Sequence, residues 1–125
     1  MSFRVTVAAR FEAAHNLIHY RGQPEPLHGH SYRVEAVLEA PGLDADDLAV
    51  DFLEARAAID AVAAELDYRN INEHPAFRGR NTSAENIARF FAERLAESPA
   101  VTGARVAEVT VWEGPENRAS YRPAV

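Results

Sequence analysis

Residues 28–40 read HGHSYRVEAVLEA, and their alternation is the clearest structural signal in the chain. Every second side chain is apolar, at Tyr32, Val34, Ala36 and Leu38. This period of two is typical of a strand with one buried face. His28 and His30 share the phase of the apolar set, so the pattern predicts a strand with two histidines on its inner face, at one end.

Residues 3–11 alternate in the same way, and His15 keeps their phase if the strand continues that far. Two adjacent antiparallel strands would then direct the imidazoles of His15, His28 and His30 into one space. Neutral imidazoles on an apolar surface are costly to desolvate without partners. A zinc ion accepts three histidine nitrogens and keeps a fourth position open. We therefore predict a catalytic zinc site; the alternative is a set of ordinary polar strand residues. His19 and His74 are interpreted as solvated loop residues.

Two helices follow the strands. Apolar residues at steps of three and four predict helices over 51–67 and from about Ser83 to Glu97. Thr82 and Glu85 have the spacing of a capping box. Strands are predicted over 105–113 and near 119–122.

The order is thus ββααββ in a single domain, 1–125. We predict an α+β fold with a four-stranded antiparallel sheet and two helices on one face. Open sheet edges favour a homo-oligomer.

Composition excludes several classes of protein. The chain has a formal net charge of −6, no cysteine, and 13 basic residues that are all arginine. Cysteine nucleophiles and lysine Schiff bases are therefore impossible, and a general nucleic-acid binder is not expected. No apolar run is long enough for a membrane helix, and no signal peptide is recognisable. We expect a cytoplasmic protein with no nucleic-acid or membrane partner.

Three acidic residues are candidates for binding or proton transfer. Glu113 ends the apolar face of a predicted strand, where a carboxylate suits a ligand with paired N–H donors; a solvated strand end is the alternative. Asp67 follows a helix end, where its charge opposes the helix dipole, although such acids are common without a function. Glu25 lies in a Pro-flanked loop near His28 and is either a candidate base or an inert carboxylate.

The chain resembles the family of 6-pyruvoyl-tetrahydropterin synthases and 6-carboxytetrahydropterin synthases over nearly its whole length. The matching motifs are FEAAH at 11–15, LHGHSY at 27–32, VDF at 50–52, LD at 66–67, NIN at 70–72, TSAEN at 82–86, VTVWE at 109–113 and ASY at 119–121. The resemblance implies a tunnelling fold (T-fold). It also implies ring assemblies, as trimers or as hexamers of stacked trimers, with sites between subunits.

The resemblance further implies Zn²⁺ on His15, His28 and His30, and a pterin ring held by Glu113 near Thr82. The implied substrate is 7,8-dihydroneopterin triphosphate or a related pterin, which undergoes triphosphate elimination or carbon–carbon cleavage. Zinc would act as a Lewis acid.

Two departures from the family pattern concern the proton relay. The family's catalytic cysteine precedes the first histidine of His-Gly-His by four residues, and that position is Pro24 here. The supporting Asp-His pair reads Asp67-Tyr68. Some relatives use a glutamate instead, and Glu25 is one residue from that position.

We expect a zinc-dependent pterin lyase in which Glu25, or a metal-bound water, is the base and Asp67 belongs to the relay. The 6-carboxytetrahydropterin reaction of queuosine biosynthesis is favoured, as the common bacterial role. The alternative is a catalytically silent zinc- and pterin-binding paralogue that acts as a carrier, sensor or partner subunit.

Overall fold

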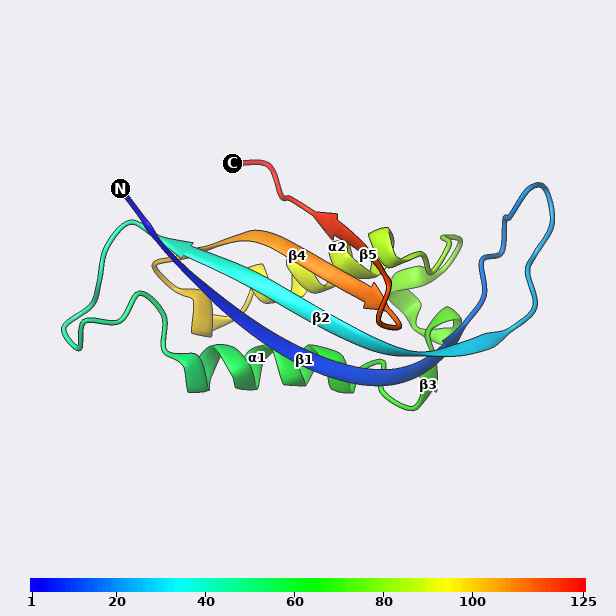
Figure 1. Ribbon diagram of the computed structural model, residues 1–125, viewed down its shortest axis with the longest axis horizontal. Helices are drawn as coiled ribbons and strands as arrows, with labels where there is room; N and C mark the ends of the chain where they lie inside the picture. Colours follow the sequence, from blue (N-terminus) through cyan, green and yellow to red (C-terminus); the bar gives the residue numbers. More distant parts are fainter.

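The alternating N-terminal segments form two long strands, β1 (Phe3–His15) and β2 (His28–Ala40), in the computed structural model, which describes residues 1–125. They pair antiparallel along their whole length, as Figure 1 shows, from Phe3 opposite Ala40 to His15 opposite His28. Alternate side chains of both strands are buried. The predicted phase is therefore confirmed, and β1 does continue to His15.

Two further strands extend the sheet beyond β2. The strand β4 (Arg105–Glu113) pairs antiparallel with β2, and β5 (Asn117–Tyr121) pairs antiparallel with β4. A fifth strand, β3 (Arg69–Asn70), lies parallel to the end of β1, so the strand order is β3-β1-β2-β4-β5. Four antiparallel strands were predicted from the sequence; the structure adds β3 and makes the sheet mixed. Two residues are too few to show an alternating pattern.

The two α-helices are α1 (Phe52–Ala64) and α2 (Ala84–Ala96). Asp51 caps α1 by accepting hydrogen bonds from the amides of Leu53 and Glu54. Ser83 caps α2, so the capping role suggested by the spacing of Thr82 is wrong. Thr82 instead faces His15, as described below. Three short 3₁₀ helices complete the fold: η1 (Ile71–Glu73), η2 (Pro75–Phe77) and η3 (Pro99–Val101).

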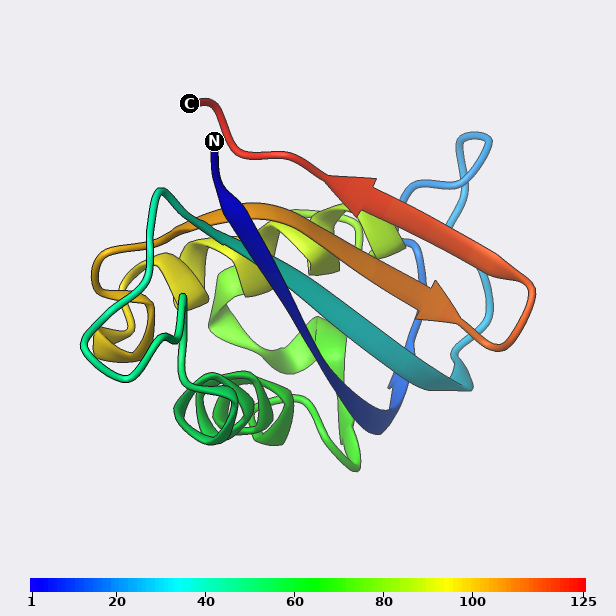
Figure 2. The ribbon, with the colours of Figure 1, turned by 60° about the vertical axis from the view of Figure 1, so that its left-hand side comes forward.

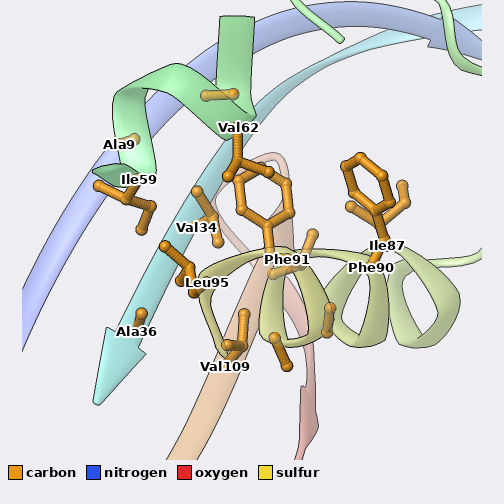
Figure 3. Packing of buried hydrophobic residues seen from close by; sticks show 14 of the residues in the cluster. Ala9, Val34, Ala36, Ile59, Val62, Ile87, Phe90, Phe91, Leu95 and Val109 are labelled. Carbon is orange, nitrogen blue, oxygen red and sulfur yellow. The ribbon is translucent and has the colours of Figure 1, made fainter. Parts of the chain in front are cut away.

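Both α-helices cover the same face of the sheet, which leaves the other face without any covering element (Figure 2). The core between the layers is a cluster of 26 buried residues. Figure 3 shows Phe91 and Ile59 from the helices against Val34 of β2. Each such apolar side chain contributes about 1.5–3 kcal/mol through burial. The predicted α+β layering, with two helices on one face, is confirmed.

His74 does not lie free in solvent as the sequence suggested. Its Nδ1 accepts a hydrogen bond from the amide of Ala76 and thereby caps η2, while its Nε2 lies 2.9 Å from Oε1 of Glu65. Its ring packs against Phe77 and Phe90. His74 is therefore a structural residue that joins η2 to both helices.

Both edges of the sheet are partly open. No strand pairs with the outer edge of β1 between Phe3 and Glu12, and β5 has only one neighbour. No helix in the chain has the length and apolar character needed to cross a membrane.

Candidate metal centre

Three imidazoles converge where β1 ends and β2 begins. The register places His15 opposite His28, and His30 follows on the same face. The ring centroids lie 4.7 to 5.1 Å apart. One nitrogen of each ring lies within 4.8 Å of the corresponding nitrogen of the other two. The strand periodicity therefore brings together the three side chains selected from the sequence.

Two hydrogen bonds direct the Nε2 atoms of His15 and His28 toward the space between the three imidazoles. Nδ1 of His15 donates to the carbonyl oxygen of Thr82 at 2.7 Å, and Nδ1 of His28 donates to that of Pro26 at 2.9 Å. This assigns the proton to Nδ1 and leaves the lone pair on Nε2. The Nε2 atoms of His28 and His30 are only 3.1 Å apart.

This donor set fits a zinc ion. Nε2 of His15 is buried and has no hydrogen-bond partner in the protein. An unpaired buried acceptor is costly, and a cation in the shared space would satisfy it. Ligand nitrogens about 2.0–2.1 Å from a tetrahedral zinc ion lie roughly 3.3 Å from each other, close to the separation of the His28 and His30 nitrogens. Imidazole nitrogens also suit copper, iron and nickel, so the geometry by itself indicates a divalent transition metal.

The environment keeps His15 neutral. Burial lowers the pKa of His15 below its usual value, and His28 and His30 lower it further when they are charged. The Thr82 carbonyl and the Glu113 carboxylate oppose this shift. A neutral imidazole is the form that binds a metal.

Two carboxylates flank the histidines. Oε1 of Glu25 is 4.0 Å from Nε2 of His28. Oε2 of Glu113 is 3.7 Å from Nε2 of His30, and its Oε1 is 4.0 Å from Nε2 of His15. Both glutamates selected from the sequence therefore lie beside the three imidazoles, although one comes from a loop and the other from the end of β4.

The histidines and both glutamates line one groove of about 390 Å³. The N-terminus of α2 forms one wall and the start of β5 forms another. The remaining lining residues are Leu17, Ser83, Ala84, Glu85, Asn117, Arg118 and Ala119. This volume is within the range of small-molecule sites.

A set of asparagines holds the loop that carries Glu25. Asn72 bonds both the amide and the carbonyl of Asn16, at 3.0 and 2.8 Å. Asn16 in turn donates to the carbonyl of Glu25, and the Glu25 carboxylate accepts from the amide of Leu17 at 2.9 Å. No role could be assigned to these asparagines from the sequence alone, because their partners lie as many as 56 residues away.

Two other predicted site residues occupy structural positions. Thr82 is fully buried behind His15 and does not line the groove. The Asp67 carboxylate accepts a hydrogen bond from the amide of Glu12 at 2.9 Å and is likewise absent from the groove. Tyr68 is 84% exposed. The catalytic role of Asp67 and the pterin-binding role of Thr82 stay predictions.

Tyr32 is a site neighbour that the sequence indicated only as a core residue. Its ring lies edge-on to His15 and His30, with centroids 5.9 and 5.5 Å apart, and stacks on Phe11. Burial raises the pKa of the Tyr32 hydroxyl, with the charges of Glu113 and Glu25 as smaller causes. Tyr32 is therefore a neutral aromatic neighbour of His15 and His30.

Residues 4–124 match the family model described as 6-pyruvoyl tetrahydropterin synthase. The chain belongs to this family. Among curated relatives, the dihydroneopterin monophosphate aldolase of Pyrococcus furiosus is 33% identical over 117 residues, which cover 93% of this chain and 94% of the relative. The 6-carboxy-5,6,7,8-tetrahydropterin synthase of Aquifex aeolicus is 26% identical, covering 98% of this chain and 99% of the relative.

Solved structures of 6-pyruvoyl tetrahydropterin synthases confirm the T-fold. The Plasmodium vivax enzyme superposes with a TM-score of 0.82 at 21% identity, over 100% of this chain and 99% of the other. A variant of that enzyme, at 20% identity and a TM-score of 0.82, carries alanine in place of a glutamate described as catalytic. The Caenorhabditis elegans enzyme gives a TM-score of 0.80 at 21% identity, over 99% of this chain and 97% of the other.

Proposed function

We propose that this protein is a zinc-dependent lyase that cleaves the side chain of a phosphorylated 7,8-dihydroneopterin. The observation that carries the proposal is the convergence of three histidine nitrogens between two glutamates in one groove. The Pyrococcus furiosus relative, named as an aldolase for dihydroneopterin monophosphate, supports carbon–carbon cleavage. Zinc held by His15, His28 and His30 would supply a Lewis acid for the hydroxyl oxygens of the side chain.

Glu113 is assigned to hold the pterin. A carboxylate accepts two parallel N–H bonds from an amidine-like edge, such as the edge of a pterin ring. Glu113 stands at the end of β4, beside the histidines and inside the groove. A ring bound there would extend its side chain toward the metal centre. This assignment orients the scissile bond relative to Glu25.

Glu25 is assigned as the general base. It removes the proton of the second side-chain hydroxyl, and the bond between the first and second side-chain carbons breaks. The bonding electrons pass into the C6=N5 bond of the dihydropterin, and an aldehyde that carries the phosphate leaves. Protonation of the first carbon then gives 6-hydroxymethyl-7,8-dihydropterin. The catalytic glutamate of the Plasmodium vivax enzyme supports a carboxylate in this role.

The backbone around Glu25 favours a fixed position for its carboxylate. Oε1 is held by the amide of Leu17, while the Asn16 side chain holds the Glu25 carbonyl. A base positioned in this way contributes about 10²–10⁴-fold to the rate. It can replace the cysteine that this chain lacks, with Pro24 at the corresponding position.

Product analysis tests the proposal. Zinc-loaded protein is incubated with dihydroneopterin monophosphate and with the triphosphate, and the products are separated by mass spectrometry. We expect 6-hydroxymethyl-7,8-dihydropterin and glycolaldehyde phosphate. Release of inorganic triphosphate with a 6-carboxy or 6-pyruvoyl product would instead place the chain with the synthases. No product above a metal-stripped control would support the silent binding paralogue.

A single substitution tests the base. Glu25→Gln should reduce turnover by about 10²–10⁴-fold while zinc content and pterin affinity stay at the wild-type level. Glu93→Gln, an exposed position on α2, is the matched control and should leave turnover unchanged. Equal turnover in Glu25→Gln and the wild type would remove Glu25 from the mechanism.

The assembly belongs to the same proposal. Ring-shaped trimers or hexamers, implied by the family resemblance, would cover the open edges of β1 and β5. Light scattering in solution tests this and should show a multiple of three chains.

A further inference from the structure

A row of arginines crosses the face of the sheet opposite the helices. Arg10 of β1 is opposite Arg33 of β2, Arg33 is opposite Trp112 of β4, and Trp112 is opposite Arg118 of β5. All four follow the phase opposite to the buried core residues. Neighbouring strands lie about 4.8 Å apart, so the row spans roughly 14 Å.

Two arginines of this row lack the acidic partner that their neighbours have. On the same face, Arg4 and Arg105 both pair with Glu39, at 2.8 and 2.7 Å, and Arg122 pairs with Glu108 at 2.8 Å. Within the row, only Arg33 forms an ion pair, with Glu35 at 3.0 Å. Neither Arg10 nor Arg118 has a carboxylate within 4 Å. The row is therefore the part of this face where positive charge is least neutralised.

The proximity of Arg10 and Arg33 destabilises the folded state. Arg10 and Arg33 are cross-strand partners, and like charges directly opposite each other in a sheet are destabilising. The Arg118 guanidinium stacks over the Trp112 ring at 4.8 Å, which orders one end of the row. The indole N–H of Trp112 is buried and has no acceptor in the protein. An anion placed along the row would relieve the repulsion between Arg10 and Arg33.

A groove accompanies the row. It measures about 520 Å³ and includes Arg10, Arg33, Trp112, Ser31 and Gly114 in its lining. The Glu12 carboxylate also lines it and accepts a hydrogen bond from Ser31 at 2.6 Å. The negative charge of Glu12 opposes anion binding. The three arginines of the row are thus balanced in part by two carboxylates, those of Glu12 and Glu35.

We propose that this row, on the face opposite the histidines, binds the phosphate chain of an oligophosphate. Guanidinium groups match phosphate oxygens bidentately, and side chains on adjacent strands can contact successive phosphates of one chain. The ligand is either free triphosphate or the triphosphate arm of a nucleotide or pterin. Arg118 also lines the groove of the histidines, but its guanidinium stacks over Trp112, and the proposal does not depend on the proposed reaction.

The single tryptophan makes the proposal directly measurable. Trp112 is the chain's one tryptophan and lies within the row, so its fluorescence reports binding there. Titration with inorganic triphosphate should give a saturable change that weakens as the salt concentration rises. ATP and orthophosphate are titrated in the same way. Equal affinity for triphosphate and ATP indicates recognition of the phosphate chain alone. Tighter binding of ATP indicates a nucleotide.

Three variants separate a loss of binding from misfolding, because one should weaken binding, one should strengthen it and one should leave it unchanged. Arg10→Gln should weaken triphosphate binding about tenfold or more, since a hydrogen bond to a charged group is worth about 1.5–3 kcal/mol. Glu12→Gln should strengthen binding, an effect that a folding defect cannot produce. Arg4→Gln, on the same face but outside the row, should leave the affinity within about twofold.

Control experiments locate the bound anion. His28→Ala should retain wild-type triphosphate affinity if the anion lies on the face of the sheet opposite the helices. The proposal is wrong if millimolar triphosphate produces no saturable signal, if Arg4→Gln weakens binding as much as Arg10→Gln, or if His28→Ala abolishes it.

Discussion

Nδ1 of His15 donates a hydrogen bond to the carbonyl oxygen of Thr82 at 2.7 Å, across 67 residues of sequence. This contact fixes the tautomer of His15 and turns its Nε2 toward His28 and His30. Partners of this kind orient a metal-binding histidine and raise its basicity. The candidate metal centre is thus tied to the residue that precedes the cap of α2, and the helix layer helps to position these histidines on the sheet.

Zinc content tests the three-histidine centre. The wild type should purify with about one zinc ion per chain, and His28→Ala should lose most of it because only two protein ligands remain. His19→Ala is the matched control, since His19 is exposed and lies outside the groove. Elemental analysis gives the content. Chelation should lower the melting temperature of the wild type and not that of His28→Ala, and a wild type that carries no ion under any loading condition contradicts the assignment.

Glu113 should separate ligand binding from metal binding. Glu113→Gln removes the charge that would accept paired N–H donors, so the affinity for the reaction product should fall by about tenfold to a hundredfold. Zinc content should not change, because the three imidazoles are intact. Pterin fluorescence titration measures the first quantity and elemental analysis the second. Joint loss of zinc and pterin would show that Glu113 is a metal ligand rather than a clamp.

Glu39 should stabilise the folded protein at neutral pH, and this contribution should be lost at acidic pH. Hydrogen bonds from Arg4 and Arg105 hold the pKa of the Glu39 carboxyl below its usual value. A lowered folded-state pKa stabilises the protein above the unfolded pKa, roughly 4.3 for glutamate. That stabilisation is lost as the pH falls through the folded value. Wild type should therefore exceed Glu39→Gln in urea resistance at pH 7, with the gap closing at acidic pH.

The difference in urea resistance between the wild type and Glu39→Gln should also shrink in high salt, because exposed ion pairs are screened. A gap that is independent of both pH and salt would mean that Glu39 contributes through packing instead.

His74 should matter for folding and not for chemistry. His74→Ala removes the cap of η2 and the hydrogen bond to Glu65. The expected loss is about 1–2 kcal/mol, seen as a lower urea midpoint at an unchanged slope. Turnover under conditions where the variant is folded should equal that of the wild type. His19→Ala, which removes an exposed imidazole, should leave the midpoint in place.

Local sequence patterns were enough to predict the four antiparallel strands, their buried faces and the three converging histidines, but not β3. A period of two is a local property, so the alternation in 3–11 and 28–40 showed which side chains point inward before any partner strand was known. The helical apolar spacing placed α1 and α2 for the same reason. The family resemblance then indicated what such a set of histidines does.

How these parts meet depends on contacts that no local pattern contains. The sequence could not show that Thr82 orients His15, that Asn72 fixes the loop before Glu25, or that His74 is a cap. It also could not align Arg10, Arg33, Trp112 and Arg118, because that row requires the register of four strands together. Register and loop contacts join residues far apart in the chain, and they are selected by the packing of the whole core rather than by any local pattern.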